Sequence, residues 1–122
     1  MDGFEVEAEV SGSQAVVVVR GEIDAATAPV LKRELVALVD TGVGRVVVDL
    51  RSVTFIESVG LGVLVAARKR LADGGDKVLC LVISAEQRNI RGPFEITRLD
   101  RVFPIHSTLQ SAIEDCLSTP AA

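Results

Sequence analysis

The segment DLRSVTFIESVGLGVL, residues 49–64, decides how this chain is expected to fold. An apolar strand over residues 46–50 runs through a short connection to Phe55 and Ile56, and the chain then places Ser58 at the start of an apolar helix. A serine at a helix N-terminus either caps the helix or presents its hydroxyl for modification. From position and chemistry alone, both interpretations of Ser58 stay open.

Length and composition restrict the classes of protein to which the chain can belong. Its 122 residues predict a single domain, with an ordered core from about residue 4 to 117. A net charge of -4 and 3% aromatic residues argue against a nucleic-acid-binding protein. The acidic N-terminus is unlike a signal peptide, and the longest uncharged apolar stretch, residues 59–67, is far below the ~20 residues that span a bilayer. We therefore expect a cytoplasmic protein without membrane insertion.

Hydrophobic periodicity predicts an alternating series of strands and helices. Strands are expected at residues 4–10, 15–19, 46–50, 78–83 and 102–105. Helices are expected at residues 28–40, from Ser58 onward, after Ser84 and after Ser107. The first two strands favour an antiparallel hairpin, and the later strand–helix–strand units favour parallel pairs with right-handed crossovers. The predicted fold class is therefore α/β with a mixed sheet.

Several local features refine this prediction. The β-branched run at residues 15–19 is expected to be buried on both faces of the sheet. Thr27 is the candidate N-cap of the first helix, and Gly92 with Pro93 should break the third. Capping-box spacings predict the starts of the last two helices, at Ser84 with Gln87 and at Ser107 with Gln110.

The two cysteines do not have the spacing of a metal-binding pair. Cys80 and Cys116 are far apart in the sequence, and His106 is the only histidine, so no metal site is expected. In a reducing cytosol we expect two separate buried thiols. The alternative is a redox pair, in which Cys80 and Cys116 form an intramolecular bridge.

The chain lacks the residue patterns of an enzyme. Ser58 is not in a G-x-S-x-G turn, because Ile56 stands where the first glycine would be. Nothing in the sequence places His106 near Ser58, and no phosphate-binding loop of the G-x-x-x-x-G-K-[ST] type occurs. We expect no catalytic residues and no cofactor.

Three segments of the chain resemble one bacterial family. Residues 49–64 closely resemble the signature of the anti-sigma factor antagonists, a STAS domain family whose members usually read like D-L-x-x-V-x-F-[IM]-D-S-[ST]-G-L-G. GEIDAATAP, residues 21–29, resembles the family's segment between the second strand and the first helix. ITRLDRVFPIHSTLQSAI, residues 96–113, resembles its C-terminal portion. The resemblance implies a mixed β-sheet of about five strands with about four helices packed mainly on one face.

The resemblance also implies partner switching. The unmodified antagonist binds an anti-sigma factor, commonly a serine kinase of the GHKL ATPase type, and thereby frees a sigma factor. The kinase phosphorylates the antagonist serine, and a serine phosphatase restores it, so ATP belongs to the partner kinase. By position, Ser58 is the phosphoacceptor. Glu57 replaces the usual Asp and keeps its charge, whereas Val59 stands where a second hydroxyl residue is common.

The helix after Ser58 offers a contact surface. Val59, Val63 and Ala66 are expected to pack on the partner, with Asp24 and Glu57 at the rim. The complete expected partner-binding set is Asp24, Glu57, Ser58, Val59, Gly60, Gly62, Val63 and Ala66. The alternative is that this helix face is buried in the core.

Two further functions stay open at this point. The chain is also consistent with a STAS regulatory or scaffold subunit of a transport or signalling complex, in which Ser58 is never modified. A redox-responsive version would use Cys80 and Cys116. The sequence leaves the oligomeric state open, including a weak homo-oligomer.

Overall fold

A computed structural model describes residues 3–71 and 77–117, which form a five-stranded sheet flanked by helices. The strands are β1 (Glu5–Ser11), β2 (Gln14–Ile23), β3 (Arg45–Ile56), β4 (Val78–Val82) and β5 (Ile105–His106). The helices are α1 (Ala28–Asp40), α2 (Ser58–Leu71), α3 (Arg88–Ile96) and α4 (Leu109–Ala112), with a 3-10 turn at Leu99–Arg101 and a π-helical turn at Ile113–Leu117. The strands lie in sequence order, β1 antiparallel to β2 and the other pairs parallel.

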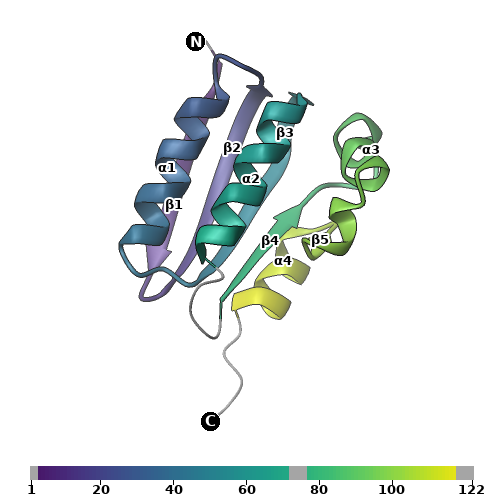
Figure 1. Cartoon of the computed structure of the whole chain (residues 1–122). Coiled ribbons are helices and arrows are strands. Elements are labelled where there is room, and N and C mark those ends of the chain that lie inside the picture. The colour runs from purple at the N-terminus through teal and green to yellow at the C-terminus, as the bar shows by residue number, and fades with distance from the viewer. Residues whose placement is uncertain (1–2, 72–76, 118–122) are drawn as a thin grey trace.

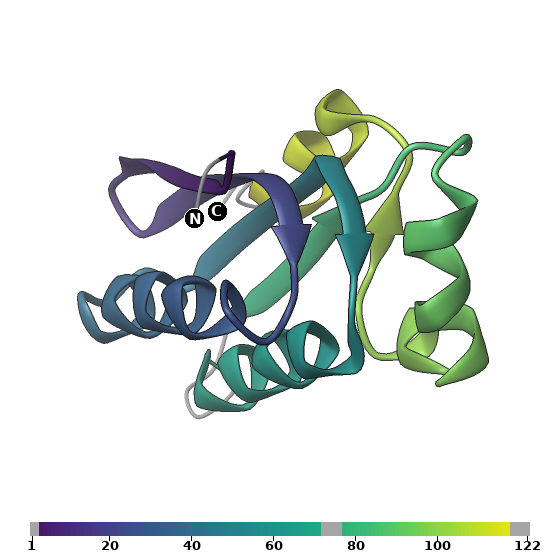
Figure 2. The same cartoon turned by 90° about the horizontal axis from the view of Figure 1, so that it is seen from above.

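The order of the strands explains where the helices lie. Successive parallel strands add in one direction across the sheet, so right-handed crossovers place the connecting helices on the same face. Figures 1 and 2 show α1 and α2 side by side on that face, whereas α4, which follows the last strand, covers the other. The mixed α/β fold predicted from the sequence is confirmed, with the two longest helices together on one face.

The larger core lies between the sheet and the helices α1 and α2. Alternate side chains of β2 and β3 point toward the leucines of these helices, and α3 adds two apolar residues to the same core. The members that fill most of this space are Val17, Val19, Leu31, Leu35, Val46, Val48, Leu61, Leu64, Ile90 and Phe94. Each such side chain contributes about 1.5–3 kcal/mol when it is fully buried, so this core dominates the stability of the fold.

A smaller apolar cluster covers the opposite face of the sheet. It consists of Val47, Cys80, Val82, Ala112 and Cys116. Because α4 and the π-helical turn are short, they leave Val16 and Val18 of β2 only half-buried. The prediction that residues 15–19 are buried on both faces is therefore wrong, since only Ala15, Val17 and Val19 are fully enclosed.

The third helix runs through the two residues that were expected to break it. α3 includes both Gly92 and Pro93. A proline disfavours the helical conformation of the residue before it, partly because the proline ring clashes with the Cβ of that residue. Gly92 has no Cβ, so this clash is absent before Pro93. Ile90 and Phe94 are completely buried on either side of the pair, and Phe94 packs edge-on against Phe103 at 6.3 Å between ring centroids. This burial offsets the backbone hydrogen bond that Pro93 cannot donate.

The starts of the last two helices also differ from the prediction. Gln87 Oε1 accepts a hydrogen bond from the backbone N–H of Ser84 at 2.9 Å, but this closes a turn, and α3 begins only at Arg88. At α4 the capping residue is Thr108, whose hydroxyl accepts from the N–H of Ser111 at 3.1 Å. The strand expected at residues 102–105 lies instead at Ile105–His106, after the 3-10 turn at Leu99–Arg101.

No helix in the described ranges is both long enough and apolar enough to cross a membrane.

Candidate functional site

The candidate site lies where β2 and β3 end and α1 and α2 begin. Parallel strands place their carboxyl ends, and the N-termini of the helices that follow, at the same edge of the sheet. Figure 1 shows α1 and α2 starting side by side at that edge. The backbone N–H of Glu57 donates to the carbonyl of Ile23 at 2.9 Å, which ties the two strand ends together directly before Ser58.

Ser58 is the first residue of α2, and its side chain is exposed. The first turn of the helix closes on the carbonyl of Glu57, which accepts from the N–H groups of Gly60 at 2.9 Å and Leu61 at 3.4 Å. Among the described residues, none forms a hydrogen bond with the Ser58 hydroxyl. In this structure Ser58 therefore does not cap α2, and its hydroxyl is exposed to solvent.

Gly60 holds α2 close to the strand ends. A Cβ at this position would lie 2.5 Å from Cγ2 of Ile23, a side chain that is itself completely buried. Gly62, on the outer side of the helix, has open space where a Cβ would stand. The two glycines therefore have different environments. Gly60 is buried beneath the proposed contact surface, and Gly62 lies on it.

Asp24 folds the loop between β2 and α1. Its Oδ1 accepts from the N–H groups of Ala26 at 2.9 Å and Thr27 at 3.0 Å, which is the geometry of an Asx turn. Thr27 occupies the N-cap position as predicted but makes no capping bond with its side chain. Its hydroxyl instead donates to the carbonyl of Glu22 at 2.7 Å. Asp24 is half-buried and has this structural task in addition to its place beside the site.

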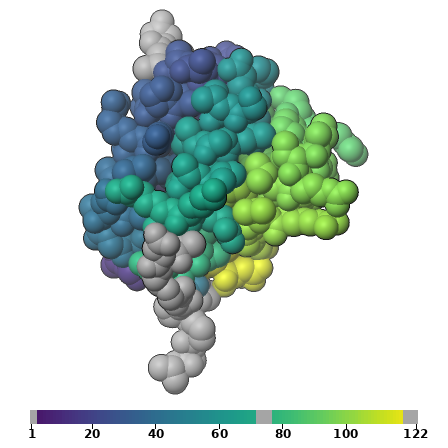
Figure 3. Space-filling view, in the orientation of Figure 1, coloured from purple at the N-terminus to yellow at the C-terminus, as the bar shows by residue number. Residues whose placement is uncertain are grey.

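An apolar hollow of about 490 Å³ lies between α1 and α2, next to Ser58. It is lined by Ala28, Pro29 and Lys32 of α1 and by Val59, Gly62, Val63 and Ala66 of α2. Val59 lies at this hollow and is 43% exposed. Figure 3 shows α1 and α2 at the surface on this side of the molecule. The hollow brings four of the residues expected to bind a partner into one surface.

Val63 belongs to both the hollow and the core. It is only 8% exposed and packs within the larger apolar cluster, yet it forms part of the floor of the hollow. The sequence-based choice between interface and core was therefore too simple for this residue. Glu57, Ser58, Val59, Gly62 and Ala66 are exposed, as a contact surface requires.

Polar residues that were not expected to take part in the site fix the strand that leads to Ser58. Asp49 is buried and forms a two-fold ion pair with Arg51, with N–O distances of 3.0 and 2.8 Å. The hydrogen bonds that Arg51 donates to Asp49 raise the pKa of Arg51 above its usual value. Gln87 Nε2 donates to the carbonyls of Leu50 and Val53, each at 3.0 Å. These contacts hold the C-terminal half of β3 in place. Local sequence patterns do not predict the bonds of Gln87, because it is far along the chain from Leu50 and Val53.

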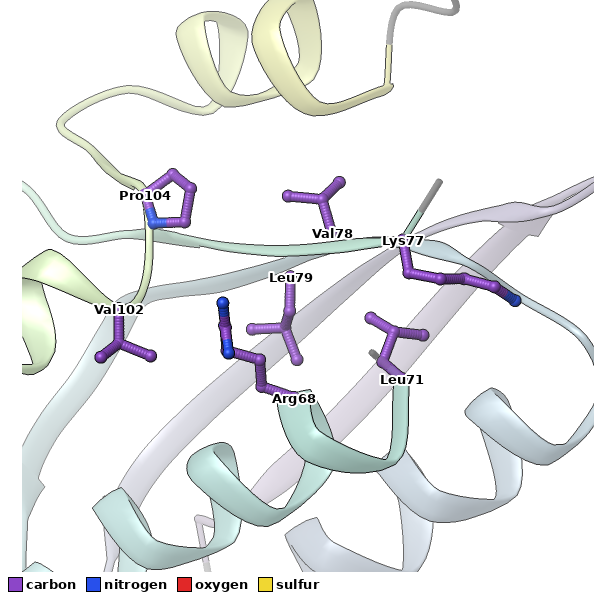
Figure 4. Close-up of a pocket in the computed structure, with 7 residues that line it drawn as sticks. All are labelled: Arg68, Leu71, Lys77, Val78, Leu79, Val102 and Pro104. Atoms are coloured by element: carbon purple, nitrogen blue, oxygen red, sulfur yellow. The ribbon is translucent and has the colours of Figure 1, made fainter. Parts of the chain in front are cut away.

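A second hollow, of about 150 Å³, lies at the opposite end of α2. Figure 4 shows Arg68 and Leu71 of α2 facing Leu79, Val102 and Pro104, with the Lys77 side chain extending to one side. Ten residues of helix separate Ser58 from Arg68, a rise of about 15 Å. This hollow is therefore not part of the site around Ser58.

Cys80 and Cys116 form a disulfide that joins β4 to the C-terminal π-helical turn. The prediction of two separate thiols is wrong, because the crossing of the last helix over the sheet brings together residues 36 positions apart. His106 lies beside them, with Nε2 at 3.9 Å from Cys116 Sγ. The histidine is thus on the face that α4 covers and not at Ser58.

The fold and the site together define a domain with an exposed serine at the first residue of a helix, beside an apolar hollow. Residues 5–112 match the model of the STAS domain family, and the chain belongs to this family. The match covers the whole region from β1 to the end of α4.

Individual relatives agree with this assignment. The chain is 34% identical over 99 residues to the anti-sigma-F factor antagonist RsfB of Mycobacterium tuberculosis, covering 81% of this chain and 78% of RsfB. It is 35% identical over 94 residues to BtrV of Bordetella bronchiseptica, covering 76% of this chain and 78% of BtrV. The crystal structure of an anti-sigma factor antagonist from Mycobacterium paratuberculosis superposes with a TM-score of 0.85 at 32% identity, covering 96% of this chain and 97% of that one.

Proposed function

We propose that this protein is an anti-sigma factor antagonist that binds its anti-sigma factor through the surface around Ser58 and is switched off by phosphorylation of that serine. The observation that supports this most strongly is the free, exposed hydroxyl of Ser58 at the edge of an apolar hollow. The names of the relatives supply the class of partner. In this proposal the protein acts in the cytoplasm by binding, without catalysis or a cofactor of its own.

The hollow between α1 and α2 provides the centre of the binding surface. Protein interfaces commonly have an apolar centre and a polar rim. Here Val59, Gly62 and Ala66 form the apolar part, while Glu57 and Lys32 stand at its edges. A partner side chain that fills the hollow would cover Val59 and remove its exposed area from water.

Phosphorylation of Ser58 should leave the fold intact. A phosphate carries about -1.5 to -2 charge at neutral pH. At the first residue of α2 it would face the positive end of the helix dipole, which favours an anion by about 0.3–1 kcal/mol. Ser58 is exposed, so the modified side chain would keep its water in the free protein.

The same phosphate would act strongly on the complex. Covering it with a partner removes its hydration and the water that screens it from the neighbouring residue Glu57, at a cost of several kcal/mol. Changing a complex from 99% to 1% bound requires about 5.5 kcal/mol of differential affinity. The energetic cost of burying a single phosphate at the interface is therefore large enough for this switch.

The switch needs two enzymes that act on Ser58. We propose that the anti-sigma factor is itself a serine kinase of the GHKL type, with its own ATP, so that it modifies the serine that it covers. A separate serine phosphatase would then act on the released protein. Exposure of Ser58 at the end of α2 supports access for both enzymes.

The proposal is tested by measuring the affinity of purified variants for the anti-sigma factor of the native host by titration calorimetry. We expect Ser58→Ala to bind like the wild type and Ser58→Glu to bind at least about tenfold more weakly, a loss of about 1.4 kcal/mol. Ser13→Glu is the matched control. It adds the same charge at an exposed serine next to the start of β2, about 30 Å from Ser58 along the strand.

Two outcomes would contradict the proposal in different ways. Equal affinities for all four proteins would show that Ser58 is not the switch. Capture of a transport or scaffold component instead of an anti-sigma factor, unchanged by Ser58→Glu, would favour a STAS regulatory subunit.

The disulfide supports a second candidate, in which the same antagonist responds to redox state. Cytosolic disulfides are rare and are commonly transient or redox-sensing. Affinity measured with the Cys80–Cys116 bond intact and after its reduction tests this candidate. Equal affinities would leave the bond with a structural role only.

A further inference from the structure

We propose that the reduced form of this protein binds one Zn²⁺ ion through Cys80, His106 and Cys116, on the face of the sheet opposite α1 and α2. The ligand atoms of these three residues, two sulfurs and a ring nitrogen, all lie within 4.8 Å of one another. They come from three elements, since Cys80 lies in β4, His106 in β5 and Cys116 in the π-helical turn. The fold therefore holds them together without any close sequence spacing.

The distances suit a tetrahedral zinc ion. With Zn–S bonds of about 2.3 Å and Zn–N bonds of about 2.0–2.1 Å, two ligand sulfurs stand about 3.8 Å apart and a sulfur and a nitrogen about 3.6 Å apart. Cys116 Sγ and His106 Nε2 are already 3.9 Å apart. The Cα atoms of Cys80 and Cys116 are 6.6 Å apart, which is near the upper end of the range for disulfides. After reduction, no bond holds the two sulfurs together, so rotation of the two side chains can separate them around an ion.

The surroundings of His106 prepare it as a ligand. Its Nδ1 lies 2.9 Å from the hydroxyl of Ser111, whose oxygen can accept a hydrogen bond from Nδ1–H in the tautomer that leaves the Nε2 lone pair for a metal. Ligand histidines in metal sites commonly have such a partner on the other ring nitrogen. On the exposed side, Asp115 Oδ2 lies 3.7 Å from Nε2, but it does not belong to the group of ligand atoms that all lie within 4.8 Å of one another, so the fourth position is left to a water molecule.

The chemistry of the ligand set selects the type of metal. Two thiolates and an imidazole favour zinc over the harder cations magnesium and calcium. Both cysteines are buried, Cys80 at 0% and Cys116 at 3% exposure, whereas His106 and Asp115 border the solvent. An ion could therefore enter from the side of Asp115 and be enclosed by the small apolar cluster around the sulfurs.

The disulfide and the zinc complex are mutually exclusive forms. Reduction of the S–S bond takes two electrons and two protons and gives two thiols, and a cellular dithiol supplies the electrons and becomes a disulfide itself. Zinc binding then forms two Zn–S bonds, and the two thiol protons pass to the solvent. Zinc would thus hold the C-terminal turn on β4 in the state in which the covalent link between Cys80 and Cys116 is absent.

The test uses the full chain, reduced with a phosphine that is then removed, and titrated with Co²⁺ and Zn²⁺. We expect one Co²⁺ per chain, with the thiolate charge-transfer absorption and the visible bands of a tetrahedral site, displaced by one Zn²⁺. The disulfide form should show neither. His106→Asn should weaken zinc affinity by about tenfold or more, the loss that follows even from changes in the outer shell of a site.

A pair of neighbouring carboxylates provides the matched control. Asp115→Asn removes a negative charge 3.7 Å from Nε2 and should weaken binding less than His106→Asn does, whereas Glu114→Gln should leave it unchanged, because the Glu114 carboxylate pairs with Gln110. The proposal is overturned if the reduced wild type gives no thiolate band, or if it binds zinc no better than the disulfide form. It is also overturned if His106→Asn keeps full affinity, since the cysteines would then bind without the third ligand.

Discussion

The two faces of the sheet are held in different ways. On one face, α1 and α2 have 13 and 14 residues and build a large core with β2 and β3. On the other, the four residues of α4 and the following π-helical turn cover only a small cluster. That small face carries the disulfide. It also has polar contacts to the π-helical turn, from Arg45 to the Cys116 carbonyl at 3.0 Å and from Gln14 to the Leu117 carbonyl. The comparison shows that packing against two long helices holds one face, while a covalent link adds to the small apolar cluster on the other.

Loss of the disulfide should have the largest effect on this comparison. Closing a loop of 36 residues is expected to stabilise the fold by about 2–4 kcal/mol, chiefly by restricting the unfolded chain. We expect metal-free Cys116→Ser to unfold at correspondingly lower urea concentration. Hydrogen exchange should show faster opening at residues 109–117, with α1 and α2 protected as before. Equal loss of protection on both faces would show that the two faces do not differ in the proposed way.

A pair of glycine substitutions on α2 tests the close packing of the helical face. Gly60→Ala would place a Cβ 2.5 Å from Ile23 Cγ2, and overpacking of this kind costs about 1–3 kcal/mol. Gly62→Ala makes the same chemical change in open space and should stabilise the helix by up to about 1 kcal/mol. Urea unfolding of both variants measures the difference. If the two substitutions have the same effect, the close approach of α2 to the strand ends is not a constraint.

The smallest expected effect concerns the surface of the helical face. Asp40, at the end of α1, and Arg70, near the end of α2, form a two-fold ion pair with both N–O distances at 2.8 Å. The hydrogen bond from Arg70 holds the pKa of Asp40 below its usual value of 3.8. The ionised pair therefore adds stability above that pH and loses it as the pH falls through the lowered pKa.

This pH dependence separates the ion pair from the packing of the two helices. The stability difference between wild type and Asp40→Asn should be small at neutral pH and should disappear as the pH falls below about 4, or as salt is added. Asp100→Asn, at an exposed carboxylate without an ion pair in the described part of the chain, is the control. A difference that persists unchanged in acid would mean that Asp40 acts through something other than its charge.

Much of the helical face could be read from local pattern. The limits of α1 agree with the predicted range 28–40, because a cap position, a proline in the first turn and a regular apolar stripe all coincide there. The helix that begins at Ser58 was also predicted, since the segment from Asp49 to Leu64 contains its own period change from strand to helix. The short connection expected after residue 50 is wrong, because β3 continues without interruption to Ile56. Local patterns fail at α3, where burial of Ile90 and Phe94 overrides the proline between them.

The sequence by itself determined the mixed α/β fold, the family resemblance and the position of Ser58, because each depends on residues that are close in the chain. Only the tertiary structure decided that the Ser58 hydroxyl is free, that Gly60 lies beneath the surface and Gly62 on it, and that a hollow separates α1 from α2. It alone brought Cys80, His106 and Cys116 within reach of one another. The physical reason is that exposure and ligand distance depend on how whole elements cross. The hydrophobic period of a segment predicts which face of a helix or strand is buried, but not which other element packs against that face.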